Sequence, residues 1–219
     1  MSLTEFASRI HCYAQRHGLG ATLGRIGISL RRAVAGRGQV LFVCDLAACP
    51  PPILDRSNPA VLERKQAEGE LNAHDLQRIL GVWNPRLAQQ RISERFSKGA
   101  SVWLWKRNGQ LAAFGWTLIG QTMERHALSP GPNDAHLFDF FVFPEYRGHR
   151  INPALVNQIL VRLASEGRSR AFIEAAGWNA AQLASLRRTP FRPFARDANR
   201  GFLASSPVIR GGQGTETVR

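Results

Sequence analysis

Two apolar stretches joined by an Asn-Gly pair constrain the fold more than any other feature. Residues 101–106 (SVWLWK) and 111–119 (LAAFGWTLI) flank Asn108-Gly109. A two-residue hairpin turn needs positive φ at both central positions, which asparagine and glycine tolerate, so this segment is predicted to form an antiparallel hairpin. The apolar run at 136–143 (HLFDFFVF) is predicted to be a third strand of the same group.

The hydrophobic period changes after this third strand. Residues Ile151, Leu155, Ile159 and Leu163 recur every four positions, which predicts a helix over 151–167. A strand at 170–176, a helix at 179–188 and a last strand at 191–195 complete the order β-β-β-α-β-α-β. That order predicts an α/β fold. Its mixed sheet has a central antiparallel hairpin leading to a parallel βαβ unit, with helices on both faces.

The first hundred residues show shorter and less regular sequence patterns. The run at 39–46 (QVLFVCDL) predicts a buried strand, and Asn72 is a candidate cap for a helix over 72–80. Asn84-Pro85 is a helix start. The polar stretch from the prolines at 50–52 to Glu70 is predicted to be a loop with a short helical piece.

The terminal segments set the expected domain limits. Residues 1–35 are predicted to be an amphipathic helical extension that either packs on its own domain or lies on a membrane surface. Residues 36–204 form the expected domain, and 205–219 (SSPVIRGGQGTETVR) a disordered basic tail. Oligomerisation through the amino-terminal helices is a further alternative.

Charge and cysteine usage restrict the class of protein. The 219 residues carry 29 Lys+Arg against 16 Asp+Glu, a net charge of +13, which favours a polyanionic partner or serves solubility alone. No apolar run is long enough for a transmembrane helix, and no secretory signal is apparent. Three cysteines without a CxxC pair predict neither a disulfide framework nor a metal site. The expected location is cytoplasmic, with peripheral membrane contact as an alternative.

The segment 141–153 (FVFPEYRGHRINP) combines features of an anion site. A strand leads through a proline-marked turn and a basic loop with Gly148 into a helix whose first free amides carry the positive end of the helix dipole. Arg147 and Arg150 add charge, and Pro153 fits the first helical turn. The alternative is an ordinary loop between a strand and a helix.

The run Val142-x-Pro144-Glu145-Tyr146-Arg147-Gly148 resembles the pyrophosphate-binding motif of the GNAT acyltransferase superfamily. The resemblance covers about residues 100–196. It implies a GNAT-like fold, an acetyl-CoA or other acyl-CoA donor, loop amides that hold the CoA pyrophosphate, and a splayed strand that pairs with the pantetheine arm. The donor-binding residues that it implies are Phe141, Val142, Phe143, Arg147, Gly148, His149, Arg150, Ile151, Asn152 and Asn179.

A second match and departures at four positions qualify this resemblance. Asn179 precedes Phe191 by twelve residues, as in the family's later helix element. However, Arg150 stands where the family has a loop glycine, and Asn152 where it has a small residue. Pro190 replaces the glycine before phenylalanine. The family's helix tyrosine, often the acid that reprotonates the CoA thiolate, falls on Leu186.

Catalytic candidates follow from the chemistry of acyl transfer, which needs a base, an oxyanion donor and an acid. Asp139 interrupts an apolar strand and is either the base or one half of a salt bridge. His136 is the second candidate base, and Tyr146 a candidate acid. The resemblance implies direct attack in a ternary complex, with a backbone amide near Val142 as the oxyanion donor. Further candidates are Glu124, His126 and Glu174.

Several functions remain open at this level. The first hypothesis is acetyl transfer to an amine or hydroxyl of a small molecule or sugar. A donor on an acidic acyl carrier protein is one alternative, and a non-catalytic GNAT-like module that binds CoA or an anionic partner is another. No nucleic-acid-binding signature appears, which disfavours that class. Three tryptophans of the hairpin either fill the core or line an acceptor cleft: Trp103, Trp105 and Trp116.

Overall fold

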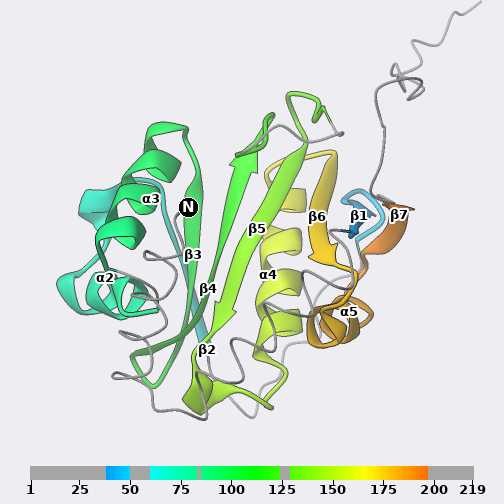
Figure 1. Ribbon diagram of the computed structural model, residues 1–219. Helices are drawn as coiled ribbons and strands as arrows, with labels where there is room; N and C mark the ends of the chain where they lie inside the picture. Colours follow the sequence, from blue (N-terminus) through cyan, green and yellow to red (C-terminus); the bar gives the residue numbers. More distant parts are fainter. Residues whose placement is uncertain (1–37, 50–59, 83–84, 124–128, 197–219) are drawn as a thin grey trace, which may run out of the picture.

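The computed structural model describes residues 38–49, 60–82, 85–123 and 129–196 (Figure 1). The predictions for 1–35 and 205–219, and the candidates Glu124 and His126, lie outside these residues. The strands are β1 (Gln39–Asp45), β2 (Ala60–Lys65), β3 (Ser101–Arg107), β4 (Gln110–Ile119), β5 (Ala135–Val142), β6 (Arg170–Ala176) and β7 (Arg192–Arg196). The helices are α2 (Ala73–Leu80), α3 (Pro85–Ser97), α4 (Ile151–Ser165) and α5 (Ala180–Leu186), with short 3-10 turns η1 (Glu68–Glu70) and η2 (Pro144–Tyr146).

The strands form one mixed sheet in the order β2-β3-β4-β5-β6-β1-β7. The predicted hairpin is confirmed as β3 and β4, and both turn residues have positive φ, 51° at Asn108 and 76° at Gly109. The predicted parallel unit is confirmed as β5-α4-β6, since β5 and β6 form the parallel pair of this sheet. The mixed α/β class follows from these two pairings.

Helices cover both faces of the sheet, as predicted. Helices α2 and α3 lie on one side, and α4 lies across the other (Figure 1). Two hydrophobic clusters correspond to these layers, one around Leu155, Ile159 and Leu163 of α4 and one around Ile79 and Ile92 of α2 and α3. Within the described part of the chain, no helix has the length and apolarity needed to cross a membrane.

The strand β2 was not predicted, because its stretch was assigned to a loop. It pairs antiparallel with β3 and forms one edge of the sheet. Its second half carries Glu63, Arg64 and Lys65, and charged residues hide the alternating pattern by which a strand is recognised. Charged side chains are typical of exposed edges, where they oppose pairing with another chain. The short helical piece predicted in the same stretch corresponds to η1.

The strands β5 and β6 separate along their length. Their parallel register covers three residue pairs, from Ala135 with Ala171 to Leu137 with Ile173, and ends there. Beyond these pairs the two strands diverge toward the loop before α4 (Figure 1). The second half of β5 therefore has a backbone edge that does not pair with β6, which is the splay that the sequence motif implied.

Candidate functional site

A bulge in β5 marks the start of the splayed segment. The register between β4 and β5 shifts between Phe114 and Trp116, and Asp139 has a φ of 49°. Gly115 lies opposite the bulge, where an added Cβ would come within 2.4 Å of the Phe140 ring. Glycine is thus the residue that permits this close approach. The bulge turns the Asp139 side chain to the face covered by α2 and α3.

Backbone alternation indicates which amides of β5 face the splay. The Phe143 amide donates to the Ala112 carbonyl of β4 at 3.0 Å. Successive amides of a strand point to opposite sides, so the Val142 amide is directed toward β6. At that position β5 and β6 no longer pair.

The loop between η2 and α4 adopts the left-handed conformation at two positions. Gly148 has a φ of 85°, and Arg150, the residue before α4, has a φ of 55°. Arg150 stands where the resembled motif has glycine. A non-glycine residue rarely adopts this conformation, so the loop keeps the backbone path of the motif while it carries an arginine.

A surface cavity of about 270 Å³ opens beside this loop. Six of the predicted donor-binding residues line it: Val142, Arg147, Gly148, Arg150, Ile151 and Asn152. The predicted acid Tyr146 also lines it. The side chains of Arg150 and Asn152 therefore border the cavity without filling it.

Three arginines give the cavity its charge. Arg147 and Arg150 belong to the loop, and Arg188 comes from the segment after α5; the residues that line the cavity include no carboxylate. The Arg147 side chain also donates from Nε to the Val142 carbonyl at 3.2 Å, which ties the loop to the end of β5. The arrangement favours a ligand with several negative charges near one another.

Asn152 connects the first turn of α4 to α5. Its Nδ2 donates to Ser185 Oγ at 2.9 Å, while its Oδ1 is buried without a hydrogen-bond partner among the described residues. An unpaired buried acceptor is costly. A ligand group with a proton to donate, or the flipped amide facing a phosphate oxygen, would satisfy it.

Asp139 is held by an arginine from α3. Arg95 Nη2 donates to Asp139 Oδ2. The guanidinium carbon of Arg95 also lies 4.9 Å from the centre of the Trp116 ring and 5.6 Å from that of Phe138. Burial lowers the pKa of Arg95, and the carboxylate of Asp139 opposes that shift. The Arg95 side chain is 5% exposed and that of Asp139 is 47% exposed, so the carboxylate reaches solvent while its partner does not.

A family model described as Acetyltransferase (GNAT) family matches residues 70–188. The chain belongs to the GNAT acetyltransferase family. Comparison with curated proteins finds no match for the sequence.

Several solved structures have a similar fold. A GNAT-family acetyltransferase from Colwellia psychrerythraea is 12% identical with a TM-score of 0.54, over 74% of this chain and 54% of its own. A tandem GNAT protein from the clavulanic acid biosynthesis pathway is 14% identical with a TM-score of 0.51, over 78% and 56%. A GCN5-related glucosamine N-acetyltransferase region of a fungal β-N-acetylglucosaminidase is 13% identical with a TM-score of 0.53, over 73% and 20%. The chain spans less than two thirds of each of these proteins.

The other residues that the GNAT resemblance singled out lie around the cavity or in the core. Asn179 accepts from the Gln182 amide and so caps α5, as predicted. His149 is exposed, with its Nδ1 at 3.3 Å from the Tyr146 carbonyl. Phe141 and Phe143 pack with Phe114 on the α2 and α3 face. Their side chains do not line the cavity.

The second candidate base is buried. His136 is 2% exposed, and its Nε2 lies 2.8 Å from Glu174 Oε2 on β6. This pair sits where β5 and β6 are still joined, so it closes the narrow end of the splay. It stabilises the junction of the two strands, whereas Asp139 lies where they begin to diverge.

The hairpin tryptophans pack in or against the core, which was one of the two interpretations given for them. Trp103 and Trp116 are fully buried on opposite faces, and Trp103 Nε1 donates to Thr117 Oγ1 at 2.8 Å. Trp105 is partly buried. Leu186, at the family's tyrosine position, is 1% exposed and belongs to the core.

Sequence reasoning missed two arginines of this site. Arg188 comes from beyond α5, and Arg95 lies on α3, 44 residues before its partner Asp139. Arg95 does follow Ile92 by three positions and so shares the buried face of α3. An arginine on an otherwise apolar face is the one signal that could have indicated it.

Cys44 lies in the segment 39–46 that was predicted to be a buried strand, and it is 3% exposed. Burial, followed by the nearby Cys49, raises the pKa of Cys44 to about 12. The thiolate is the reactive form, and at pH 8 its fraction is on the order of one in ten thousand. We expect iodoacetamide at pH 8 to leave Cys44 unmodified in native protein and to alkylate it in urea, as read by peptide mass spectrometry. Alkylation of Cys44 in the folded protein would contradict this.

Proposed function

We propose that this GNAT-family protein is an acyl-CoA-dependent acetyltransferase that acts on an amine or hydroxyl of a small molecule or sugar. The observation that carries the proposal is the cavity at the start of α4, walled by Arg147, Arg150 and Arg188 at the open end of β5. Charge, shape and position suit the diphosphate of CoA. The arm that bears the thioester would then run back along the unpaired edge of β5.

The residues at the departures from the family motif fit such a donor. Arg150 adopts the positive φ that the loop needs, and its guanidinium adds a charge-assisted contact that glycine lacks. The free amides at the first turn of α4 supply further donors. The polar side chain of Asn152 borders the same space.

The proposed chemistry is direct attack in a ternary complex. The acceptor nitrogen or oxygen attacks the thioester carbon and gives its proton to Asp139, while the Val142 amide stabilises the oxyanion. Collapse forms the new C–N or C–O bond and breaks the C–S bond. The departing thiolate takes a proton from Tyr146. In the family a helix tyrosine often supplies this proton, and Leu186 stands at its position here.

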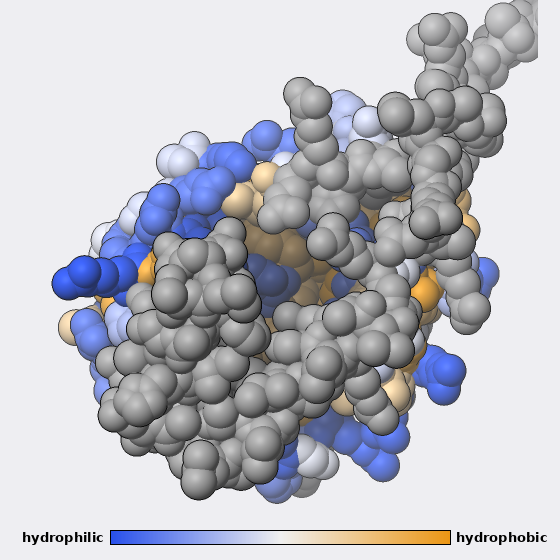
Figure 2. Space-filling model, in the orientation of Figure 1, coloured by the Kyte–Doolittle hydropathy of each residue, from blue (hydrophilic) through white to orange (hydrophobic). Residues whose placement is uncertain are grey.

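The acceptor would approach Asp139 from the side of α3. Arg95 contacts one carboxylate oxygen, and nearly half of the Asp139 side chain is exposed. Figure 2 shows hydrophilic atoms among apolar ones over the middle of the sheet. A surface of this mixed character suits a small acceptor with both polar and apolar parts.

Calorimetry with CoA tests the donor site without knowledge of the acceptor. We expect Arg147→Ala to raise the dissociation constant for CoA about tenfold or more, because it removes a charge-assisted contact and frees the end of β5. Arg162→Ala, in the last turn of α4, is the matched control and should leave CoA binding unchanged. Equal CoA affinity in wild-type and Arg147→Ala protein would refute the donor-site assignment.

One observation favours a second candidate, a non-catalytic module that binds CoA. Leu186 is buried at the position of the usual acid, so the chain lacks that group there. An assay of thiol release from acetyl-CoA over a panel of amines and aminosugars separates the two. Acyl transfer supports the enzyme, and CoA binding without transfer to any acceptor supports the module. Transfer from an acyl carrier protein alone would instead identify the carrier as the donor.

A further inference from the structure

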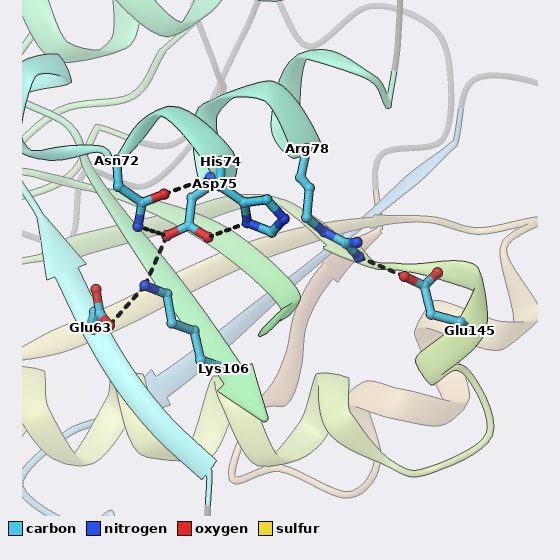
Figure 3. Close-up of polar contacts among 7 residues, drawn as sticks. All are labelled: Glu63, Asn72, His74, Asp75, Arg78, Lys106 and Glu145. Atoms are coloured by element: carbon cyan, nitrogen blue, oxygen red, sulfur yellow. Dashed lines mark hydrogen bonds and ion pairs between the residues drawn. The ribbon is translucent and has the colours of Figure 1, made fainter. Parts of the chain in front are cut away.

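One residue of α2 reaches the turn that leads into the donor loop. Arg78 Nη2 donates to Glu145 Oε1 at 2.6 Å, and the guanidinium carbon lies 4.2 Å from the centre of the Phe143 ring. Figure 3 shows the side chain extending from α2 toward Glu145. Phe143 and Glu145 flank Pro144, so a single arginine contacts the chain on both sides of the first residue of η2.

These contacts constrain Arg78 more than an exposed ion pair would. An ion pair at a surface contributes little by itself. Here the planar guanidinium is held by a ring and a carboxylate together, and its Nε is buried. The hydrogen bond from Arg78 holds the pKa of Glu145 below its usual value, so Glu145 is charged at neutral pH.

The helix that carries Arg78 is itself fixed at its other end. Asn72 caps α2 through the Asp75 amide, and Asp75 Oδ2 accepts from Lys106 Nζ of β3 at 2.8 Å. The same Nζ lies 2.9 Å from Glu63 of β2 (Figure 3). With its first turn anchored to two strands, α2 provides a rigid base for Arg78.

We propose that Arg78 is a positioning residue for the donor site. By holding Phe143 and Glu145, it fixes the direction in which the chain enters the loop at Arg147 to Arg150. The loop amides and arginines are then preorganised for the diphosphate, and binding does not have to order them. This inference rests on the proposed function, because it assumes that CoA occupies the cavity.

Calorimetric titration with CoA of Arg78→Met protein tests the inference. Methionine keeps much of the apolar stem but removes the ion pair and the stacked guanidinium. We expect the dissociation constant for CoA to rise about tenfold, although Arg78 does not line the cavity. Arg78→Lys keeps a charge and loses the planar stack, so a rise of about threefold is expected.

Arg64 offers a matched control. Its guanidinium lies 5.0 Å from the centre of the Trp103 ring and donates at 2.9 Å to both oxygens of Glu166, beyond the far end of α4. Arg64→Met therefore removes the same kinds of contact away from the donor loop. We expect its melting temperature to fall comparably, while its CoA affinity stays at the wild-type value.

A double-mutant cycle with Glu145→Gln completes the test. If Arg78 acts through Glu145, the double variant should bind CoA no more weakly than Arg78→Met alone. Equal CoA affinity in the wild-type, Arg78→Met and Arg64→Met proteins would overturn the inference and leave the proposed function intact. Absence of CoA binding by wild-type protein would overturn the proposed function as well.

Discussion

We expect Asp139→Asn to lower turnover at least about a hundredfold, the usual scale for the loss of a general base. Asparagine is close in size to aspartate but cannot accept the acceptor's proton. The measurement is the rate of thiol release from acetyl-CoA with an acceptor that the wild-type protein acetylates. The affinity for CoA should change little, because Asp139 does not line the donor cavity.

The ion pair with Arg95 makes a control necessary. Asp139→Asn also weakens the contact to a guanidinium that is 5% exposed, so part of the loss could be structural. Arg95→Gln breaks the same pair but keeps the carboxylate, and we expect it to retain turnover within about tenfold of wild type. Near-wild-type turnover in folded Asp139→Asn protein would remove this residue from the mechanism.

Local signals predicted the central part of the fold. The Asn108-Gly109 pair can be recognised without any tertiary information because it needs positive φ at adjacent positions, and the structure has it. The helix over 151–165 follows from its apolar repeat in the same way. Such features depend only on residues within a few positions of one another.

Features that depend on distant partners were not predictable in this way. The strand β2 can be recognised only from its pairing with β3. Its charged residues interact with residues distant in the sequence, such as Arg64 with Glu166. Asp139 illustrates the same limit within the site. The sequence left it as a base or half of a salt bridge, and the structure shows the salt bridge while leaving the carboxylate exposed.

The bulge at Asp139 was also not predictable from the sequence. Alternation along β5 would have placed Phe138 and Asp139 on opposite faces, yet both contact Arg95 of α3. The extra residue is accommodated because Gly115 on β4 leaves room for the Phe140 ring. That compatibility involves two strands at once, so neither strand alone reveals it.

We expect Lys106→Met to give the largest loss of stability, about 3 kcal/mol in the free energy of unfolding. Asp75 is 2% exposed at its side chain, and Lys106 neutralises it at 2.8 Å. Methionine would leave a buried carboxylate with only polar partners, namely the Asn72 amide and the neighbouring His74. Urea unfolding followed by tryptophan fluorescence measures the change.

The pH dependence of this pair has a defined sign. Burial lowers the pKa of Lys106, but hydrogen bonds and charge interactions with Asp75 and Glu63 outweigh burial and raise it above the ordinary value of 10.5. A raised lysine pKa contributes stability that is complete below the unfolded value and is lost as pH rises through the folded one. The difference between wild type and Lys106→Met should therefore be fully present at pH 7 and shrink above about pH 10.5.

Two further variants identify the buried charge as the cause. Lys98→Met removes a lysine from the exposed pair with Glu94, and we expect it to cost less than about 1 kcal/mol. Asp75→Asn added to Lys106→Met removes the unpaired carboxylate and should recover part of the lost stability. If the free energy of unfolding of Lys106→Met lies within about 1 kcal/mol of the wild-type value, burial of the Asp75 carboxylate does not depend on this lysine. The anchored first turn of α2, from which Arg78 reaches the donor loop, would then need another explanation.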